Sequence, residues 1–189
     1  MRVVGGVAGG IPLHVPRGSG DGLRATLDMV KNAIFNVLGD SVEGTRVLEL
    51  FAGVGGLGIE ALSRGAASCV FVESDRKACD TIRRNLEKTR LPGAEVVTSD
   101  ALKWIERSGG EAGYDLILAD PPYAKARDDR DFTPELIGSA ALLSALKPGG
   151  LFVLEHLPNA EIDLGGKWEC ARRKRYGATE VSFLRPIPA

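Results

Sequence analysis

Residues 48–58 read Leu-Glu-Leu-Phe-Ala-Gly-Val-Gly-Gly-Leu-Gly, and this segment is the strongest indication of the architecture. An apolar strand-like run passes directly into a glycine-rich turn, and a helix is expected to open at Gly56. In an open sheet of parallel strands, ligands bind at such a turn, outside the carboxyl end of a strand. The spacing Gly53-x-Gly55-x-x-Gly58 satisfies the dinucleotide fingerprint, and Glu73 follows about 20 residues later, where a ribose-binding acid belongs. The motif alone therefore permits NAD.

Strand-like and helical segments alternate on both sides of this turn. Strands are expected over 46–51, 68–72, 95–98, 114–119 and 151–155, and helices over 26–39, 56–64, 75–88, 102–107 and 134–146. This alternation is typical of an α/β fold, a parallel sheet with helices on both faces. The alternation ends at residues 167–175 and 178–185, which predict an antiparallel hairpin at the edge of the sheet.

Residues 1–24 differ in composition from the rest of the chain. They are rich in glycine and proline, with short β-like pieces at 2–4 and 11–15. We therefore expect a β-hairpin arm outside the core over 1–24, followed by one domain over 25–189. A chain of 189 residues has room for one well-buried domain of this kind.

The overall composition excludes several classes of protein. With 44% hydrophobic and 26% charged residues, the chain resembles a soluble globular protein, and its apolar runs are too short to cross a bilayer. Its first residues carry no apolar stretch of signal-peptide length, which predicts a cytoplasmic location. Cys69, Cys79 and Cys170 form no Cys-x-x-Cys pair, so we expect neither a disulfide framework nor a metal site. No heptad pattern is apparent, and we expect a monomer.

The formal net charge of −1 conceals an uneven distribution of charge. Residues 172–175 form a basic run, and the N-terminal region carries four more bases with few acids to oppose them: Arg2, Arg17, Arg24 and Lys31. A polyanion needs a local positive surface rather than a high overall pI, so nucleic acid is a compatible partner. On charge alone, a solvated basic strand edge that discourages aggregation is equally compatible.

Two acids favour S-adenosylmethionine over NAD as the ligand of the glycine-rich turn. Glu49 lies in the approach to the turn, where a carboxylate suits a ligand with a sulfonium and an ammonium group but repels a pyrophosphate. Asp100 follows the third expected strand, where it can accept a hydrogen bond from an adenine amino group. The alternative is structural: the glycines only allow a helix to pack tightly on a strand, and Glu73 and Asp100 only cap the helices that follow them.

The tetrapeptide Asp120-Pro121-Pro122-Tyr123 follows the strand expected at 114–119. Two prolines lack backbone N–H donors and keep the chain extended, so the Asp120 carboxylate and the Pro121 carbonyl can converge on one point as acceptors. The exocyclic amino group of a nucleobase offers two donors at such a point, and Tyr123 adds a flat face on which an extruded base can stack. Taken alone, the tetrapeptide favours a proline-rich turn with a buried tyrosine, but its neighbours here favour a base-binding role.

These residues together resemble the class I S-adenosylmethionine-dependent methyltransferases and, within them, the RsmD-like family of ribosomal RNA guanine-N2 methyltransferases. The resemblance extends over almost the whole chain. The chain departs from the family pattern at Ala25, Met29, Lys31 and Glu49, where the family usually has proline, two arginines and aspartate. The motifs that carry the resemblance are Gly5-Gly6, Gly9-Gly10, Arg24-Ala-Thr26, Glu49-Leu-Phe-Ala-Gly-Val-Gly55, Glu60-Ala-Leu-Ser-Arg-Gly-Ala66, Val72-Glu73, Asp120-Pro-Pro-Tyr123 and Tyr176-Gly-Ala-Thr179.

The resemblance implies a Rossmann-like fold with a mostly parallel seven-stranded sheet, and methyl transfer from S-adenosylmethionine to the exocyclic N2 of one guanine of 16S ribosomal RNA. The implied substrate is the 30S subunit or a late assembly intermediate. The implied catalytic residues are Asp120, Pro121 and Tyr123. The implied cofactor-binding residues are Glu49, Phe51, Gly53, Gly55, Glu73, Ser74, Asp100, Ala101 and Asp120. The expected RNA contacts are Arg2, Arg17, Arg24, Lys31, Arg173 and Arg175.

Three other functions are compatible with parts of the pattern. A DNA adenine-N6 methyltransferase would use the same tetrapeptide on a different amine, although 189 residues leave little space for a target-recognition domain. A ribosome-assembly factor could bind RNA and keep S-adenosylmethionine as a structural ligand without catalysis. An NAD-dependent oxidoreductase would account for the glycine-rich turn alone.

Overall fold

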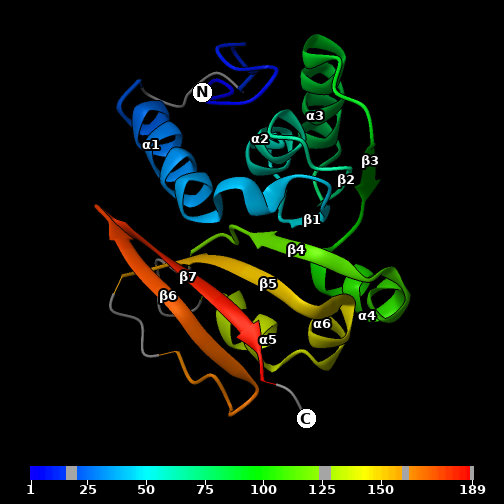
Figure 1. Ribbon diagram of the computed structural model, residues 1–189, viewed down its shortest axis with the longest axis vertical. Helices are drawn as coiled ribbons and strands as arrows, with labels where there is room; N and C mark the ends of the chain where they lie inside the picture. The colour runs from blue at the N-terminus through cyan, green and yellow to red at the C-terminus, as the bar shows by residue number, and fades with distance from the viewer. Residues whose placement is uncertain (16–20, 124–128, 159–161, 188–189) are drawn as a thin grey trace.

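The computed structural model describes residues 1–15, 21–123, 129–158 and 162–187, with only the backbone for 21–27 and 108–112 (Figure 1). Its centre is a seven-stranded sheet in the order β3-β2-β1-β4-β5-β7-β6. Neighbours from β3 to β5 pair in parallel, whereas β7 pairs antiparallel with both β5 and β6. The predicted parallel sheet with an antiparallel C-terminal hairpin is confirmed. The strands are β1 (Arg46–Leu50), β2 (Ser68–Glu73), β3 (Ala94–Thr98), β4 (Tyr114–Ala119), β5 (Leu146–His156), β6 (Trp168–Tyr176) and β7 (Thr179–Pro186).

Helices cover both faces of the sheet (Figure 1). None of them, within the described ranges, is long and apolar enough to cross a membrane. One face carries α1 (Asp21–Leu38), the 3₁₀ helix η1 (Gly39–Val42), α2 (Gly56–Ser63) and α3 (Arg76–Thr89), and the other carries α4 (Ala101–Ala112), α5 (Phe132–Gly138) and α6 (Ala140–Ala145).

Each face of the sheet has its own hydrophobic cluster. Leu116 and Leu118 of β4 join the cluster under α1 and α2, whereas Ile117 and Ala119 join the cluster under α4, α5 and α6. Successive side chains of a strand point to opposite faces, so a strand covered on both faces needs apolar residues throughout. This requirement explains why β4 reads as a continuous apolar run before it ends at Asp120.

Several predicted boundaries are wrong. The first helix begins at Asp21 rather than Thr26, so residues 21–24 belong to α1 and not to the predicted arm. The helix predicted over 134–146 is two helices, because Ser139 takes an extended ψ of 112°. Its side chain caps α6 by accepting a hydrogen bond from the Leu142 N–H at 3.1 Å. The first helix therefore ends at Gly138, and Ser139 directly after it caps the second helix.

Three apolar residues of the first 15 are part of the core, which corrects the prediction that this segment lies wholly outside it. Arg2 and Pro12 make a single antiparallel bridge, and Val3, Ala8 and Leu13 are buried in the cluster that α1 and α2 share. The segment lies against α2, and the burial of its apolar side chains there removes them from water, which stabilises the contact.

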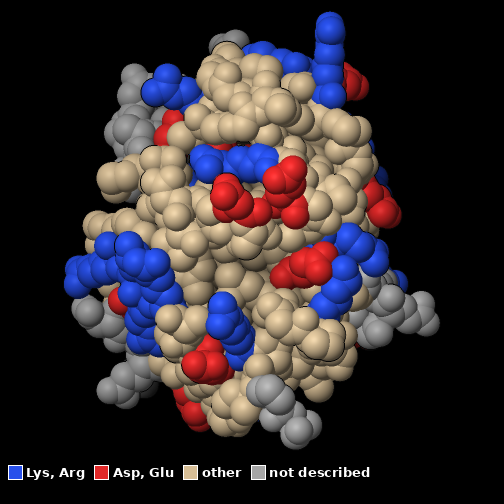
Figure 2. All heavy atoms as spheres, in the orientation of Figure 1, with Lys and Arg blue, Asp and Glu red and all other residues tan. Residues whose placement is uncertain are grey.

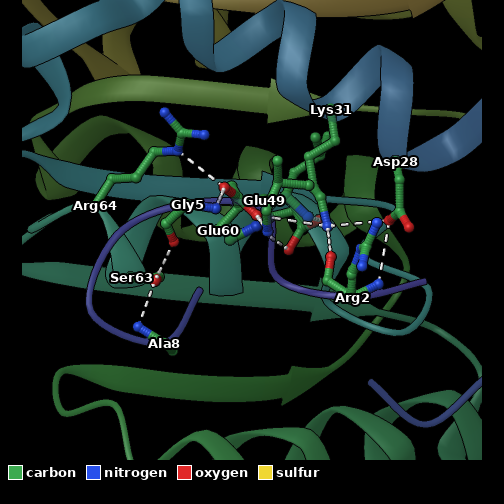
Figure 3. A network of polar contacts seen from close by, with 12 residues as sticks. Arg2, Gly5, Ala8, Asp28, Lys31, Glu49, Glu60, Ser63 and Arg64 are labelled. Atoms are coloured by element: carbon green, nitrogen blue, oxygen red, sulfur yellow. Dashed lines mark hydrogen bonds and ion pairs between the residues drawn. The ribbon is translucent and has the colours of Figure 1, made fainter. Parts of the chain in front are cut away.

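Polar groups of α2 hold this segment in place (Figure 3). The Glu60 carboxylate, which is fully buried, accepts hydrogen bonds from the Val4 N–H at 2.7 Å and the Gly5 N–H at 2.8 Å. Ser63 accepts from the Ala8 N–H at 2.9 Å and donates to the Gly5 carbonyl at 2.6 Å. These bonds satisfy backbone groups that would otherwise be buried without partners.

Gly6 allows the close approach of the two segments. Its φ is +74°, and a Cβ atom there would lie 1.8 Å from the Ser63 carbonyl oxygen. Only glycine fits both conditions. The Gly5-Gly6 motif and the motif that begins at Glu60 are therefore the two sides of one contact.

Candidate active site

The glycine-rich turn is held by Glu49 at the end of β1. The two carboxylate oxygens of Glu49 accept hydrogen bonds from the N–H groups of Leu57, at 3.1 Å, and Gly58, at 3.0 Å, in the first turn of α2. Burial raises the pKa of Glu49 to about 8, although these two amides oppose the shift. A Cβ at Gly58 would lie 2.4 Å from the Phe71 ring. The third glycine of the fingerprint therefore serves close packing of α2 on the sheet.

Phe51 begins the turn in an unusual backbone conformation. Its φ is 56°, in the left-handed region that non-glycine residues rarely occupy. Its ring packs edge-on against Phe132, with 5.0 Å between the ring centroids. Residues held in this way are concentrated at functional sites.

Glu73 and Asp100 bind backbone groups at the ends of β2 and β3. Glu73 accepts hydrogen bonds from the Gly53 and Asp75 N–H groups, both at 2.8 Å, so it joins the glycine-rich turn to the next strand. Asp75, not Glu73, caps α3, whereas Asp100 does cap α4 through the Lys103 N–H at 2.9 Å. The capping interpretation therefore holds for Asp100 and fails for Glu73.

Two cavities meet at the end of β4. The first, which we call the glycine-loop cavity, measures about 250 Å³, and the second, the β2–β3 cavity, about 340 Å³. Phe51 and Asp120 line both of them. The glycine-loop cavity is lined by Met1, Lys31, Glu49, Phe51, Ala52, Gly53, Val54, Gly56, Leu57, Asp120 and Glu155. The β2–β3 cavity is lined by Phe51, Val72, Glu73, Ser74, Ser99, Asp100, Ala101, Asp120, Pro122 and Phe132.

All but one of the predicted cofactor-binding residues line these cavities. The exception is Gly55, which is buried against Ile59, Ile82 and Phe71, where a Cβ would lie 3.2–3.3 Å from side-chain atoms. Its φ of +80° places it in the left-handed region, so Gly55 shapes the turn and packs it on the core.

Asp120 stands where the two cavities join. Burial raises the pKa of its carboxyl group to about 6. No hydrogen bond to this carboxylate occurs within the described part of the chain, so its oxygens are available to a ligand. Pro121 beside it is buried and Pro122 is exposed.

Tyr123 is fixed by a hydrogen bond between its hydroxyl group and the Thr179 hydroxyl at the start of β7. Burial raises the pKa of Tyr123 to about 12, so it is neutral at physiological pH. The ring is half-buried, which leaves part of its surface open to a partner.

Sequence reasoning missed Glu155, the third acid of the glycine-loop cavity. Glu155 lies near the end of β5, the parallel neighbour of β4, and it is buried beside Asp120. Burial first, and then the Asp120 charge, raise the pKa of Glu155 well above its usual value, while a hydrogen bond from Thr179 opposes them. Two features of the sequence could have identified Glu155. It is an acid at the carboxyl end of a predicted strand, as Asp120 is, and Thr179, which bonds to it, belongs to the motif that begins at Tyr176.

Sequence reasoning also missed Asn85, a buried residue of α3. Its side-chain amide donates to the Val54 carbonyl at 3.0 Å and to the His14 carbonyl at 3.2 Å, and its oxygen accepts from the His14 N–H at 2.6 Å. Asn85 therefore links the glycine-rich turn to the N-terminal segment. Nothing in the sequence around it distinguished this asparagine.

Lys31 is not at the surface, which corrects its prediction as an RNA contact. Only 3% of the residue is exposed, and its ammonium group donates a hydrogen bond to the Arg2 carbonyl. It lies 3.5 Å from a Glu60 carboxylate oxygen and 3.6 Å from an Asp28 oxygen. Acids of α1 itself and of α2, rather than solvent, surround this charge.

The other predicted RNA contacts have different outcomes. Arg2, Arg173 and Arg175 are exposed. Figure 2 shows basic side chains gathered over β6 and β7, where the run of residues 172–175 lies. Arg17 and the side chain of Arg24 lie outside the described residues.

Comparison with known proteins relates the whole chain to one family. A family model described as Conserved hypothetical protein 95 matches residues 1–185. The "Putative rRNA methyltransferase YlbH" of Bacillus subtilis is 36% identical over 188 residues, which cover 98% of this chain and 98% of that protein. The "Ribosomal RNA small subunit methyltransferase D" of Escherichia coli is 35% identical over 125 residues, which cover 66% of this chain and 61% of that protein.

A solved structure shares the fold of this chain. The "T. Thermophilus 16S rRNA N2 G1207 methyltransferase (RsmC) in complex with AdoMet and Guanosine" superposes with a TM-score of 0.73 at 26% identity, over 90% of this chain and 44% of that one. The predicted Rossmann-like methyltransferase fold is thus confirmed. Because the family model covers nearly every residue, the chain belongs to the RsmD family, described as Conserved hypothetical protein 95.

Proposed function

We propose that this protein transfers a methyl group from S-adenosylmethionine to the exocyclic N2 of one guanine of 16S ribosomal RNA, at position 966. Family membership and the names of the relatives support the coarser activity, methylation of ribosomal RNA with S-adenosylmethionine. One observation carries the finer proposal: Asp120, whose carboxylate accepts no hydrogen bond from the described residues and which is followed by a proline, lines both cavities. It thus borders the whole proposed cofactor site, with carboxylate oxygens that an amino group can reach.

The lining of the two cavities fits S-adenosylmethionine better than NAD. Glu73 and Asp100 in the β2–β3 cavity offer acceptors for ribose hydroxyl and adenine amino groups. The glycine-loop cavity holds three acids, Glu49, Asp120 and Glu155. A sulfonium and an ammonium group would lower the raised pKa values of these buried acids and favour their ionised forms, whereas a pyrophosphate would raise the pKa values further. When it is bound, S-adenosylmethionine supplies an electrophilic methyl group.

The chain positions the amino group that accepts the methyl group. A guanine N2 amine is a poor nucleophile, because its lone pair is delocalised into the ring. The Asp120 carboxylate and the Pro121 carbonyl can accept its two N–H groups, which holds the nitrogen in one orientation and favours pyramidalisation. The Asp120 carboxylate is also placed to take the proton that the nitrogen loses.

Tyr123 supports an extruded base. A base must leave its stack before an enzyme can reach its amino group in a pocket, and an aromatic face then holds it. Stacking on an aromatic side chain contributes about 1–3 kcal/mol per base. The hydrogen bond to Thr179 fixes the Tyr123 ring before the base arrives, so less entropy is lost on binding.

The exposed bases position the RNA through its phosphates. We place the phosphate contacts on Arg2 of the N-terminal segment and on Arg173 and Arg175 of β6, with Arg17 and Arg24 as further candidates. The two β6 residues stand two positions apart and so project from the same face of the strand. Phosphate contacts orient the RNA without reading its sequence.

The double variant Arg173→Ala/Arg175→Ala is expected to flatten the salt dependence of RNA binding. Each lost phosphate contact lowers the slope of log K against log salt by about 0.7–0.9, so the pair should lower it by about 1.4–1.8. Fluorescence titration of a 16S ribosomal RNA fragment at several salt concentrations measures the slope. Arg83→Ala/Arg84→Ala on α3, which packs beside β3 at the opposite edge of the sheet, is the matched control. An unchanged slope would make the basic run a solubilising strand edge only.

The proposed reaction is tested by methyl transfer to defined substrates. Small subunits from a strain that lacks this methylation are incubated with labelled S-adenosylmethionine, beside free 16S ribosomal RNA and duplex DNA. We expect label in the 30S subunit or its late assembly intermediate, recovered as N2-methylguanosine after digestion to nucleosides. Label in DNA as N6-methyladenosine would support a DNA methyltransferase, and binding of the cofactor without transfer would support an assembly factor. We place the reaction in the cytoplasm and assign it to a monomer.

A further inference from the structure

Lys31 is a buried cation at the edge of the glycine-loop cavity. Among the described residues that line the two cavities, it is the only lysine or arginine. The other ionisable groups of the glycine-loop cavity are the acids Glu49, Asp120 and Glu155. A cavity with acids and a single cation has the charge pattern of a site for a ligand that carries both signs of charge.

Lys31 lies among acidic side chains of α1, α2 and β1 (Figure 3). Its ammonium group is close to the carboxylates of Glu60 and Asp28, and Arg64 bonds to the opposite oxygen of Glu60 at 2.9 Å. Glu49 is a third acid whose charge interacts with Lys31. A further carboxylate near Lys31 would leave each acid with another partner, because Glu60 bonds to Arg64, Asp28 accepts from the Arg2 N–H, and Glu49 accepts from two amides of α2.

The ammonium group also has hydrogen-bonding capacity to spare. It has three N–H donors, and its one hydrogen bond within the described residues goes to the Arg2 carbonyl. The distances of 3.5 and 3.6 Å to Glu60 and Asp28 are long for charge-assisted hydrogen bonds, which are typically about 2.7–2.9 Å. Lys31 can therefore donate a short bond to an additional acceptor in the cavity.

The N-terminus of α2 borders the same cavity. Gly56 and Leu57, the first residues of this helix, line it together with Lys31. The Leu57 and Gly58 N–H groups in the first turn of this helix already bind the Glu49 carboxylate. Lys31 is therefore the group on this border that can bind a further anion.

We propose that Lys31 binds the α-carboxylate of the amino-acid part of S-adenosylmethionine and selects cofactors that carry this group. The inference rests on the proposed cofactor. It gives a role to a buried lysine that was expected to contact RNA. A phosphate of the RNA does not reach this side chain, because α1, α2 and the N-terminal segment enclose it.

The test compares two ligands that differ only in the carboxylate. Isothermal titration measures the affinity of the full-length protein for S-adenosylhomocysteine and for its decarboxylated analogue, in which the amine remains. We expect the wild type to prefer S-adenosylhomocysteine by about 10- to 100-fold, the usual effect of a charge-assisted hydrogen bond. Lys31→Gln, which keeps a donor for the Arg2 carbonyl but removes the charge, should reduce this preference to about threefold or less, chiefly by weakening S-adenosylhomocysteine.

Lys88→Met is the matched control. The Lys88 ammonium group donates to the Pro12 carbonyl at 2.6 Å, so this variant also loosens the N-terminal segment, but Lys88 lines neither cavity. It should keep the wild-type preference.

The outcomes separate the inference from the proposed function. If the wild type binds the two ligands equally, or if Lys31→Gln weakens both equally, Lys31 is only structural and the inference is wrong. If the wild type binds neither ligand, the proposed cofactor is wrong and the inference falls with it. Should Lys31→Gln fail to fold, the same two affinities are measured for the wild type and for Lys31→Met, and their ratios are compared in the same way.

Discussion

Asp120→Ala is expected to lower kcat for methyl transfer by about 10³-fold, because removal of one oriented hydrogen-bonding group in an active site already costs about 10²–10³-fold and this carboxylate also receives a proton. The affinity for S-adenosylhomocysteine should stay within a few fold, since most of the cavity lining remains. Single-turnover transfer to small subunits measures the rate, and titration calorimetry measures the affinity. Retained turnover would remove Asp120 from the mechanism.

Asp115→Ala is the matched control at the other end of β4. Asp115 bonds to Lys147 through both oxygens at 2.9 Å, far from the cavities, and its loss should leave kcat unchanged. A comparable loss of rate in both variants would point to a damaged strand rather than to chemistry at Asp120.

The pH profile gives an independent measure of the same carboxylate. Burial raises the pKa of Asp120 to about 6, and only the ionised form offers both oxygens as acceptors. The value of kcat/KM should therefore be level above pH 6 and fall about tenfold per pH unit below it. Because Glu155 is buried beside Asp120, the apparent pKa belongs to the pair of acids. A profile that is flat from pH 5 to pH 8 would contradict an ionised Asp120.

The second large effect concerns stability. Glu60→Ala is expected to lower the free energy of unfolding by about 3–5 kcal/mol, the usual cost of removing one partner from a buried ion pair. The Val4 and Gly5 N–H groups would lose their acceptor, and Lys31 and Arg64 would lose a counter-ion (Figure 3). Urea denaturation measures the change, and the melting temperature should fall by about 6–20 °C for a chain of this size.

Glu87→Ala provides the comparison for Glu60→Ala. Glu87 is exposed on α3, and a surface substitution of this kind usually changes the free energy of unfolding by less than about 0.5 kcal/mol. A loss below about 1 kcal/mol in Glu60→Ala would mean that solvent or rearranged side chains replace the network, and that the N-terminal segment is held by its apolar contacts alone.

The sheet and the glycine-rich turn could be predicted because their signals are local. The spacing of apolar residues predicts each strand and helix. A run of glycines after a strand indicates the carboxyl edge of a parallel sheet. The break between α5 and α6 was not predicted, because apolar spacing continues across Gly138 and Ser139 and only a cap tells two helices from one. The burial of Val3, Ala8 and Leu13 was also not predicted, since a glycine-rich segment gives no local sign that Glu60 will bind its backbone.

The candidate site shows the same division. Asp120 and the acids after β2 and β3 stand at strand ends, and strand ends are visible in a sequence. Lys31 was misplaced because a lysine on a helix is usually solvated, and its burial depends on Asp28 and Glu60, of which Glu60 lies 29 residues away. Glu155 became significant only when the sheet order put β5 beside β4.

The backbone of Phe51 has a consequence for directed evolution. A left-handed conformation costs a non-glycine residue about 1–3 kcal/mol, so glycine would relax the chain at this position. The aromatic ring, however, forms a wall of both cavities. A library of variants screened for thermal stability alone would therefore enrich substitutions that remove this ring from the cavities. Its most stable variants would have the lowest activity.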